Sequence, residues 1–271
     1  PRAQFAAEAT DNGFDAPGSP FPGEDNLVYR AYLYACRELG VRPHGLRLRE
    51  NGALPPARGL GSSAACAVAG VLAACALHGQ AADPGPVFQL ASRIEGHPDN
   101  AAPAVYGGLR ACLVEGGKVY SLPCALHPSL RFLLLVPDFE LETRQSRAAL
   151  PESLPLKDAS LQGQRLAFTI RALESGDTEA LSLGARDLLH EPHRFPLIAG
   201  GPALREAMLG AGAAACLISG AGPSLLCLYT AEDFPARARA ALSAFPAFKA
   251  LEAGVDYDGA RTETGNKKNA L

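Results

Sequence analysis

Residues 54–65 read Leu54-Pro55-Pro56-Ala57-Arg58-Gly59-Leu60-Gly61-Ser62-Ser63-Ala64-Ala65 and lead into an Ala-rich apolar run that ends at Leu77. This pattern predicts a Gly-rich loop at the start of a buried helix. The first backbone N–H groups of a helix have no partner within the helix, and the helix dipole adds positive charge there. Glycines let an anion approach such a backbone closely. The segment therefore predicts a phosphate-binding loop and a protein that handles a nucleotide.

The loop differs from two common phosphate-binding motifs. No Gly-Lys-Ser/Thr triplet follows at the Walker A spacing, and the glycines do not form a G-x-G-x-x-G pattern. Ser62 and Ser63 are suited to cap the helix, and equally to turn a hydroxyl towards a phosphate or Mg²⁺. Because Gly59 and Gly61 precede them, phosphate binding is favoured over an ordinary cap.

Composition limits the class of protein. The chain has 271 residues, 48% of them hydrophobic and 20% charged, which is typical of a folded protein of one or two domains. Its net charge of -3 gives no reason to expect nucleic acid as a partner. The apolar run up to Leu77 is too short to span a bilayer, so no membrane partner is expected. The seven cysteines form no CxxC pair and are interpreted as buried thiols of a cytoplasmic protein.

A composition shift near His127-Pro128 predicts two α+β domains, residues 1–127 and 128–271. Residues 1–25 read as a loop with a short strand. Apolar spacing predicts helices over 26–39, 64–77, 85–94, 144–149, 162–174, 178–189, 202–210 and 231–244. It predicts strands over 45–49, 109–114, 118–122, 130–136, 214–218, 224–229 and 248–251.

Two further segments concentrate residues that carry chemistry. Glu95-Gly96-His97-Pro98-Asp99-Asn100 places four polar side chains between apolar runs, which favours a functional site although each residue alone suits a structural role. Ser219-Gly220-Ala221-Gly222-Pro223-Ser224 reads as a glycine turn between two strands. Such a turn exposes backbone N–H groups, and taken alone it is also typical of a plain hairpin.

Together, the loop and the Ser-Gly-Ala-Gly-Pro-Ser turn resemble the GHMP kinase superfamily. Residues 95–108, 190–194 and 255–261 resemble the homoserine kinases among them. The resemblance implies an α+β fold of two domains. The N-terminal half would be like domain 2 of ribosomal protein S5, and the C-terminal half would be ferredoxin-like.

The resemblance implies an ATP-dependent kinase that phosphorylates the hydroxyl of L-homoserine to O-phospho-L-homoserine in threonine biosynthesis. The residues it assigns to ATP are Pro56, Arg58, Gly59, Leu60, Gly61, Ser62, Ser63, Ala64 and Ala65. The residues it assigns to the substrate are His97, Asp99, Asn100, Arg186, Arg194 and Gly220. Asn100 and Arg194 would be catalytic. Because an asparagine cannot usefully accept a proton, positioning and charge neutralisation would drive the transfer.

The resemblance also implies Mg²⁺, with Ser63 as one ligand. In the superfamily a glutamate about one helix length before the Asn100 position binds the metal. Counting back reaches Gln89, which is neutral and a poorer ligand, whereas Glu95 lies closer in the chain. Both residues stay open as the second ligand.

The superfamily's first motif, Pro-x-x-x-Asn-Leu-Gly-x-Gly-Phe-Asp, is absent. Residues 11–15 echo its end but lie too close to the helix expected at Asn26. We therefore expect the motif to lie upstream of Pro1.

Two other functions stay open. One is a GHMP kinase for another small alcohol, such as mevalonate or a sugar. The other is a non-catalytic relative that binds a nucleotide, which Gln89 in place of a carboxylate favours. The expected partners are L-homoserine and ATP, and the resemblance allows a homodimer.

Overall fold

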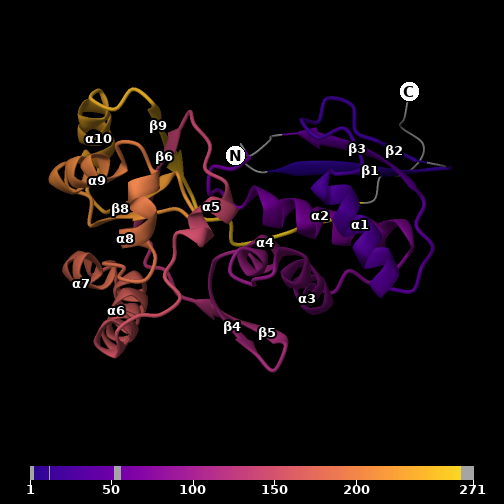
Figure 1. Cartoon of the computed structure of the whole chain (residues 1–271), viewed down its shortest axis with the longest axis horizontal. Helices are drawn as coiled ribbons and strands as arrows, with labels where there is room; N and C mark the ends of the chain where they lie inside the picture. Colours follow the sequence, from indigo (N-terminus) through magenta and orange to yellow (C-terminus); the bar gives the residue numbers. More distant parts are fainter. Residues whose placement is uncertain (1–2, 12, 52–55, 264–271) are drawn as a thin grey trace. The chain divides into compact units, whose positions relative to one another are not determined.

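A computed structural model describes residues 3–11, 13–51 and 56–263 and divides the chain into two compact units. The first unit comprises the described residues of Pro1–Leu54, Gly61–Pro123 and Val255–Leu271, and the second comprises those of Pro55–Leu60 and Cys124–Gly254. A division was expected near His127. The structure divides the chain at Cys124. In addition, residues 255–263 belong to the first unit and residues 56–60 belong to the second (Figure 1).

The second unit is built on a four-stranded antiparallel sheet in the order β7-β8-β6-β9. Its strands are β6 (Arg131–Pro137), β7 (Ala215–Ile218), β8 (Leu225–Tyr229) and β9 (Phe248–Ala253). Its helices are α5 (Thr143–Ala148), α6 (Leu156–Ser175), α7 (Thr178–Gly184), α8 (Glu191–Arg194), α9 (Gly201–Gly210) and α10 (Phe234–Leu242), with a 3-10 turn at Phe195–Leu197. The chain order of strand, helices, two strands, helix and strand, with this sheet order, is ferredoxin-like and confirms the expectation.

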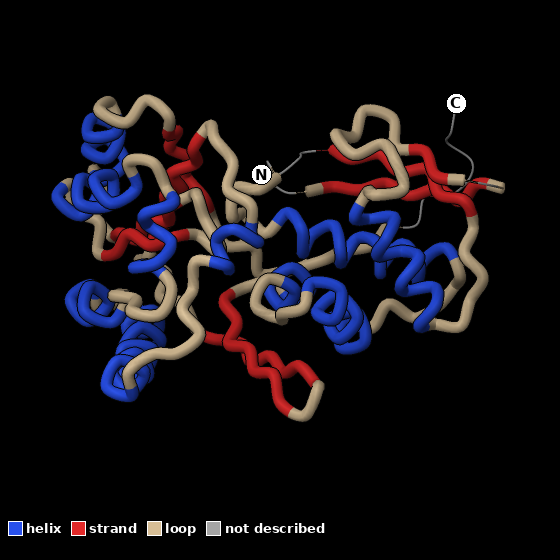
Figure 2. Tube along the Cα trace, viewed as in Figure 1, coloured by secondary structure: helices blue, strands red, loops and turns tan. Residues whose placement is uncertain are grey.

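The first unit places helices on one face of the small sheet β1-β3-β2, as Figure 2 shows. Its strands are β1 (Gln4–Thr10), β2 (Phe14–Asp15), β3 (Gly45–Asn51), and the hairpin of β4 (Leu109–Glu115) and β5 (Lys118–Cys124). Its helices are α1 (Leu27–Glu38), α2 (Ser62–Leu77), α3 (Pro84–Glu95) and α4 (Ala101–Tyr106). Apolar residues of all four helices form one core with Leu46 of β3.

The Ala-rich helix α2 is the centre of this core because its small side chains allow close packing. A Cβ added at Gly70 would lie 2.4 Å from the carbonyl oxygen of Val28 and 2.5 Å from Cβ of Ala31, both in α1. Helix α2 begins at Ser62 and Ser63, about two turns before Gly70. The tight packing of α1 against α2 therefore fixes where the start of α2 lies within the first unit.

Several elements differ from the sequence prediction. Residues 1–25 were expected to be a loop with a short strand, and residues 4–10 form a strand of seven residues. Residues 101–106 form a helix that was not expected. Helix α6 begins at Leu156 rather than at residue 162, and α7 ends at Gly184 rather than at residue 189. The early end of α7 has a clear cause, because Asp187 directs the chain into the next turn through bonds to three backbone N–H groups.

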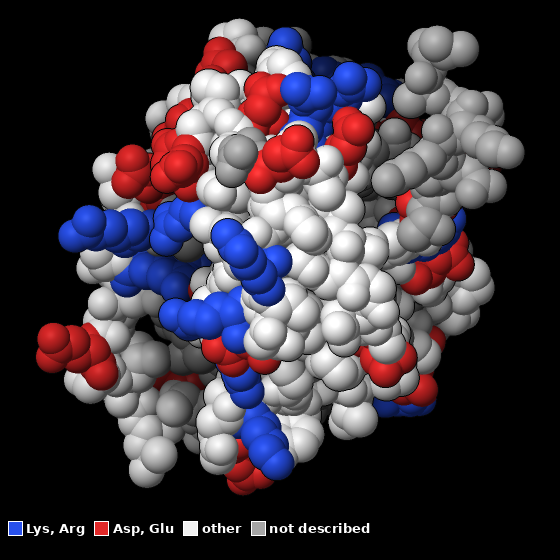
Figure 3. Space-filling model, turned by 90° about the vertical axis from the view of Figure 1, so that its right-hand side faces the viewer, with Lys and Arg blue, Asp and Glu red and all other residues white. Residues whose placement is uncertain are grey.

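Acidic and basic side chains lie beside one another around a broad uncharged area on the face drawn in Figure 3. Within the described residues, no helix is long and apolar enough to cross a membrane. The seven cysteines are free thiols, and four of them are buried.

Candidate functional site

The Gly-rich loop begins in the second unit, where it packs on the glycine turn between β7 and β8. The hydroxyl of Ser219 donates to the carbonyl oxygen of Gly59 over 2.8 Å, and the N–H of Ser224 donates to the carbonyl oxygen of Arg58 over 3.3 Å. Gly59 has a φ of 71°, and a Cβ there would lie 2.2 Å from the carbonyl oxygen of Ser219. Only glycine fits this contact. Leu54 and Pro55, the start of the predicted loop, lie outside the described residues.

Arg58 anchors the loop rather than extending from it. Its guanidinium donates to the carbonyl oxygens of Pro137 (3.1 Å), Asp138 (3.0 Å) and Pro56 (3.3 Å), and it pairs with Glu140 over 3.2 Å. The side chain is only 12% exposed. These bonds use the donors that a phosphate contact would need, so the geometry gives Arg58 a structural role.

In the first unit, the loop ends at the start of α2. Gly61 is the N-cap residue in the left-handed conformation, with a φ of 73°, and no acidic residue lies in the first turn. Ser62 and Ser63 are the first two residues of the helix, and Ala64 is buried beneath them whereas Ala65 is half-buried. The positive end of a 16-residue helix is therefore not neutralised by its own side chains.

Glu95, the last residue of α3, lies beside the start of α2. The Ser63 hydroxyl donates to its carboxylate over 2.5 Å. Gln89 points elsewhere, because its side chain donates to the carbonyl oxygen of Val119 over 2.7 Å and accepts from the N–H of the same residue over 3.4 Å. The structure thus brings together Ser63 and Glu95, and it uses Gln89 to hold β5.

The polar segment after α3 turns sharply at Gly96, which has a φ of 79° and ends that helix. The His97 ring contacts the Asp99 carboxylate, and the same carboxylate accepts from the N–H of Asn100 over 2.9 Å. Asn100 is the N-cap residue of α4, yet its side chain makes no capping bond. Its amide is therefore not used by the helix that it precedes.

The C-terminal segment holds the other end of α4. The N–H of Gly108 donates to the carbonyl oxygen of Asp256 over 2.7 Å, and the N–H of Ala260 donates to that of Val105 over 3.2 Å. A Cβ at Gly107 would lie 2.6 Å from the carbonyl carbon of Tyr257. Residues 255–261, which carry part of the resemblance, therefore support the polar segment through α4.

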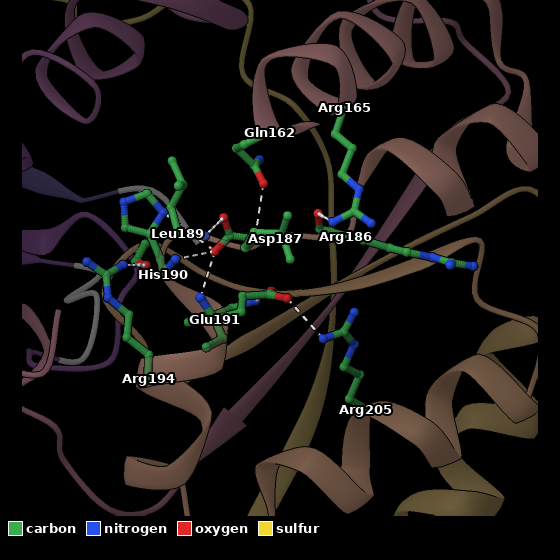
Figure 4. Close-up of polar contacts among 12 residues, drawn as sticks. Gln162, Arg165, Arg186, Asp187, Leu189, His190, Glu191, Arg194 and Arg205 are labelled. Atoms are coloured by element: carbon green, nitrogen blue, oxygen red, sulfur yellow. Dashed lines mark hydrogen bonds and ion pairs between the residues drawn. The ribbon is translucent and has the colours of Figure 1, made fainter. Parts of the chain in front are cut away.

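Arg194 lies at the end of the short helix α8 in the second unit. Its guanidinium donates to the carbonyl oxygen of Gly220 over 3.1 Å, next to the turn that supports the loop. The start of α8 is held by Asp187, which accepts from the N–H groups of His190 (2.8 Å) and Glu191 (2.6 Å) (Figure 4). Burial alone would raise the pKa of Asp187, but its bonds to the His190 side chain and to backbone N–H groups outweigh burial and hold that pKa well below its usual value.

Glu191 and Arg205 complete the surroundings of α8. Glu191 is 5% exposed, accepts from the N–H of Ile218 over 2.9 Å and pairs with the Arg205 guanidinium over 3.0 Å. Burial raises the pKa of Glu191, while the Ile218 bond and Arg205 oppose the rise. Asp187 and Arg205 were not predicted from the sequence, and Glu191 lies in the segment 190–194 that carries the resemblance but was given no role. The sequence feature nearest to these residues is the charged segment 190–194, which ends at Arg194.

Arg186 is not placed beside Arg194. Figure 4 shows the two side chains extending in opposite directions. Arg186 is exposed, and its Nε donates to the carbonyl oxygen of Ser182 over 3.2 Å. The geometry therefore gives Arg186 a local contact with its own segment.

Comparison with known families agrees with this arrangement. A family model described as "GHMP kinases N terminal domain" matches residues 26–108, and one described as "GHMP kinases C terminal" matches residues 169–247. The chain belongs to the GHMP kinases, a family of ATP-dependent kinases with this α+β fold.

Within that family the chain groups with the homoserine kinases. It is 44% identical to a homoserine kinase of Thermus thermophilus over 78% of this chain and 72% of that protein. It is 42% identical to homoserine kinase of Synechococcus sp. (strain RCC307) over 76% of this chain and 66% of that protein. The crystal structure of homoserine kinase from Cytophaga hutchinsonii is similar with a TM-score of 0.83 at 27% identity, over 96% of this chain and 88% of that chain. The match thus spans about two thirds of the length of the curated relatives.

Proposed function

We propose that the protein transfers the γ-phosphoryl group of ATP to the side-chain hydroxyl of L-homoserine, giving O-phospho-L-homoserine for threonine biosynthesis. The observation that carries this proposal is the 42–44% identity to homoserine kinases over at least 76% of the chain. The polar segment from Glu95 to Asn100 and the placement of Arg194 support it.

The start of α2 and the loop before it suit the phosphates of ATP. Backbone N–H groups at a helix start and the positive dipole end favour an anion, and Gly61 to Ser63 form such a start. Gly59 and Leu60 lead into it from the segment that Ser219 supports. Arg58 would act by holding the loop in shape.

Ser63 and Glu95 fit a magnesium ion, since Mg²⁺ prefers hard oxygen ligands and usually takes only one carboxylate or two from the protein. The 2.5 Å contact between their oxygens places a hydroxyl and a carboxylate side by side, as two ligands of one metal ion would be. When bound, Mg²⁺ would neutralise charge on the phosphates. We therefore assign the metal to Ser63 and Glu95 and not to Gln89, whose amide is used by Val119.

Arg194 is suited to the charged groups of the reaction. A guanidinium binds a carboxylate or a phosphoryl group through paired hydrogen bonds, and its bond to Gly220 fixes its direction. Asn100 can donate and accept hydrogen bonds but does not act as a base. We infer that Asn100 orients the hydroxyl while His97 and Asp99 hold the segment, and that catalysis arises from positioning and charge neutralisation.

The test is release of ADP by the full-length protein with Mg-ATP and L-homoserine, mevalonate or galactose as acceptor, with the product identified by phosphorus NMR. Homoserine-dependent formation of a phosphate ester is expected. Turnover of mevalonate or galactose without turnover of homoserine would indicate a kinase for another alcohol. Saturable ATP binding without turnover of any acceptor would indicate the non-catalytic relative.

We also propose a cytoplasmic location and a homodimer. Cys216 and Cys227 are opposite each other on β7 and β8 with sulfurs 3.6 Å apart, and they are free thiols, which suits a reducing compartment.

Light scattering coupled to gel filtration tests the homodimer. A single monomeric mass at micromolar concentration would contradict it.

A further inference from the structure

Helix α8 needs support from outside itself. It spans only Glu191–Arg194, and a helix of this length has no stability of its own. Arg194 nevertheless has a defined contact with Gly220. The position of the guanidinium must therefore come from residues that fix α8 against the rest of the second unit.

Glu191 makes the connection that fixes α8. Its Oε1 accepts from the N–H of Ile218, the last residue of β7, and two residues later Gly220 accepts from Arg194. These two bonds close a ring that contains both α8 and the start of the glycine turn. Movement of α8 relative to the turn would break one bond or the other.

The charge pair that completes the ring is costly to bury. Glu191 is 5% exposed, and a buried carboxylate lowers stability unless it is paired and hydrogen-bonded. Arg205 supplies the pair over 3.0 Å, and its guanidinium lies over the Phe195 ring, 5.3 Å from the ring centre. A glutamine could accept from the Ile218 N–H without the cost of burying a charge, so the ion pair needs another explanation.

We propose that Glu191 is a positioning residue, which holds the Arg194 guanidinium at the Gly220 turn for the phosphorylation of homoserine. This inference rests on the proposed function. Asp187 and Arg205 assist it, one at the start of α8 and the other as the charge partner. Glu191 itself does not contact the substrate. Its effect on the reaction passes through Arg194.

The test is a double-mutant cycle in the full-length enzyme. Glu191→Gln keeps an oxygen for the Ile218 N–H but removes the charge that holds Arg205. We expect kcat/KM for homoserine to fall at least about 10-fold, with KM for ATP within about twofold of wild type. In an Arg194→Ala background the same change should cost less than about twofold, because the residue through which it acts is gone.

Glu206→Gln is the matched control, since Glu206 is the exposed neighbour of Arg205 on α9. It should leave kcat/KM for homoserine unchanged. If Glu191→Gln does not fold, Arg205→Lys replaces it in the cycle, because it keeps the charge and changes the geometry. An equal loss in both backgrounds, or no loss in the Arg194-containing enzyme, would overturn the proposal.

Amide hydrogen exchange separates this proposal from the proposed function. Glu191→Gln should speed exchange at Ile218, because a neutral amide oxygen is a weaker acceptor than the carboxylate, while Glu206→Gln should not. This measurement needs no turnover, so wild-type enzyme that fails to phosphorylate homoserine counts against the proposed function alone. Unchanged exchange in residues 215–222 of Glu191→Gln would overturn the role of Glu191.

Discussion

The hydroxyl of Ser219 donates a hydrogen bond to the carbonyl oxygen of Gly59 over 2.8 Å, joining residues 160 positions apart in the chain. This bond fixes the Gly-rich loop on the turn whose Gly220 also accepts from Arg194. The part of the loop that lies in the second unit is therefore held by the same turn that orients Arg194.

Gly59→Ala is expected to destabilise the protein by about 2–4 kcal/mol, because a Cβ would lie 2.2 Å from the carbonyl oxygen of Ser219 and 2.7 Å from that of Gly222. Gly61→Ala is the matched control. Gly61 has nearly the same φ, but nothing lies within 4 Å of its added Cβ, so only the conformational cost of about 1–2 kcal/mol remains. Urea unfolding measures both. Equal losses would show that the close contact with the turn is unimportant.

Glu95→Gln is expected to lower kcat about 100-fold at low Mg²⁺, with part of the activity recovered at high Mg²⁺, because the carboxylate beside Ser63 is lost. Gln89→Ala should lower stability through loss of its two bonds to Val119, without changing the Mg²⁺ dependence. Magnesium titrations of initial rates distinguish the two variants. A shift in Mg²⁺ dependence for Gln89→Ala but not for Glu95→Gln would reverse the assignment.

The choice between Gln89 and Glu95, which the sequence left open, illustrates what the sequence could not predict. Counting residues along a helix assumes that the segment between α3 and Asn100 has a fixed length. The position of a side chain in space depends instead on where α3 ends, and Gly96 ends it directly after Glu95. The residue types of the site were evident from sequence, whereas the contact between Ser63 and Glu95 required the packing of α2 against α3.

The fold was predictable where local signals are strong. The strand before the glycine turn, the β4–β5 hairpin and the long helix α2 have clear apolar patterns and glycine boundaries. The position and length of β1 could not be predicted because Gln4–Thr10 is rich in alanine, which has low β-propensity, and the strand exists through its pairing with β3. Helix α4 was not predicted, and Pro103 lies in its first turn, where proline is tolerated.

Arg58→Ala is expected to lower the free energy of unfolding by about 2–4 kcal/mol, because the carbonyl oxygens of Pro137 and Asp138 lose a charged donor. The KM for ATP of the folded variant should rise less than about threefold if the guanidinium does not contact phosphate. Arg58→Lys keeps the charge near Glu140 and serves as the comparison. A large rise in KM for ATP with unchanged stability would restore Arg58 as a phosphate ligand.

Asp187 is expected to make stability depend on pH in the acid range. Its pKa is held below the usual value in the folded protein, so the unfolded chain binds the proton first as the pH falls through about 4. Stability from this group is present above that pH and is lost below it. Asp187→Asn should therefore lower stability by about 1–2 kcal/mol at pH 7, and this deficit should shrink towards pH 2. A deficit that is the same at both pH values, measured by urea unfolding, would contradict this role.

Arg194→Ala and Arg186→Ala are expected to separate two arginines that sequence alone could not distinguish. The Arg194 guanidinium is fixed at Gly220, whereas Arg186 extends away from it and donates to Ser182 of its own segment (Figure 4). Loss of a preorganised cation from the transferring group should lower kcat/KM for homoserine about 100- to 1,000-fold in Arg194→Ala. Arg186→Ala should stay within about threefold of wild type, because its contact is exposed and local. Steady-state kinetics with homoserine varied at saturating ATP measures both variants. Comparable losses of kcat/KM in Arg194→Ala and Arg186→Ala would indicate that Arg186 also contacts the substrate.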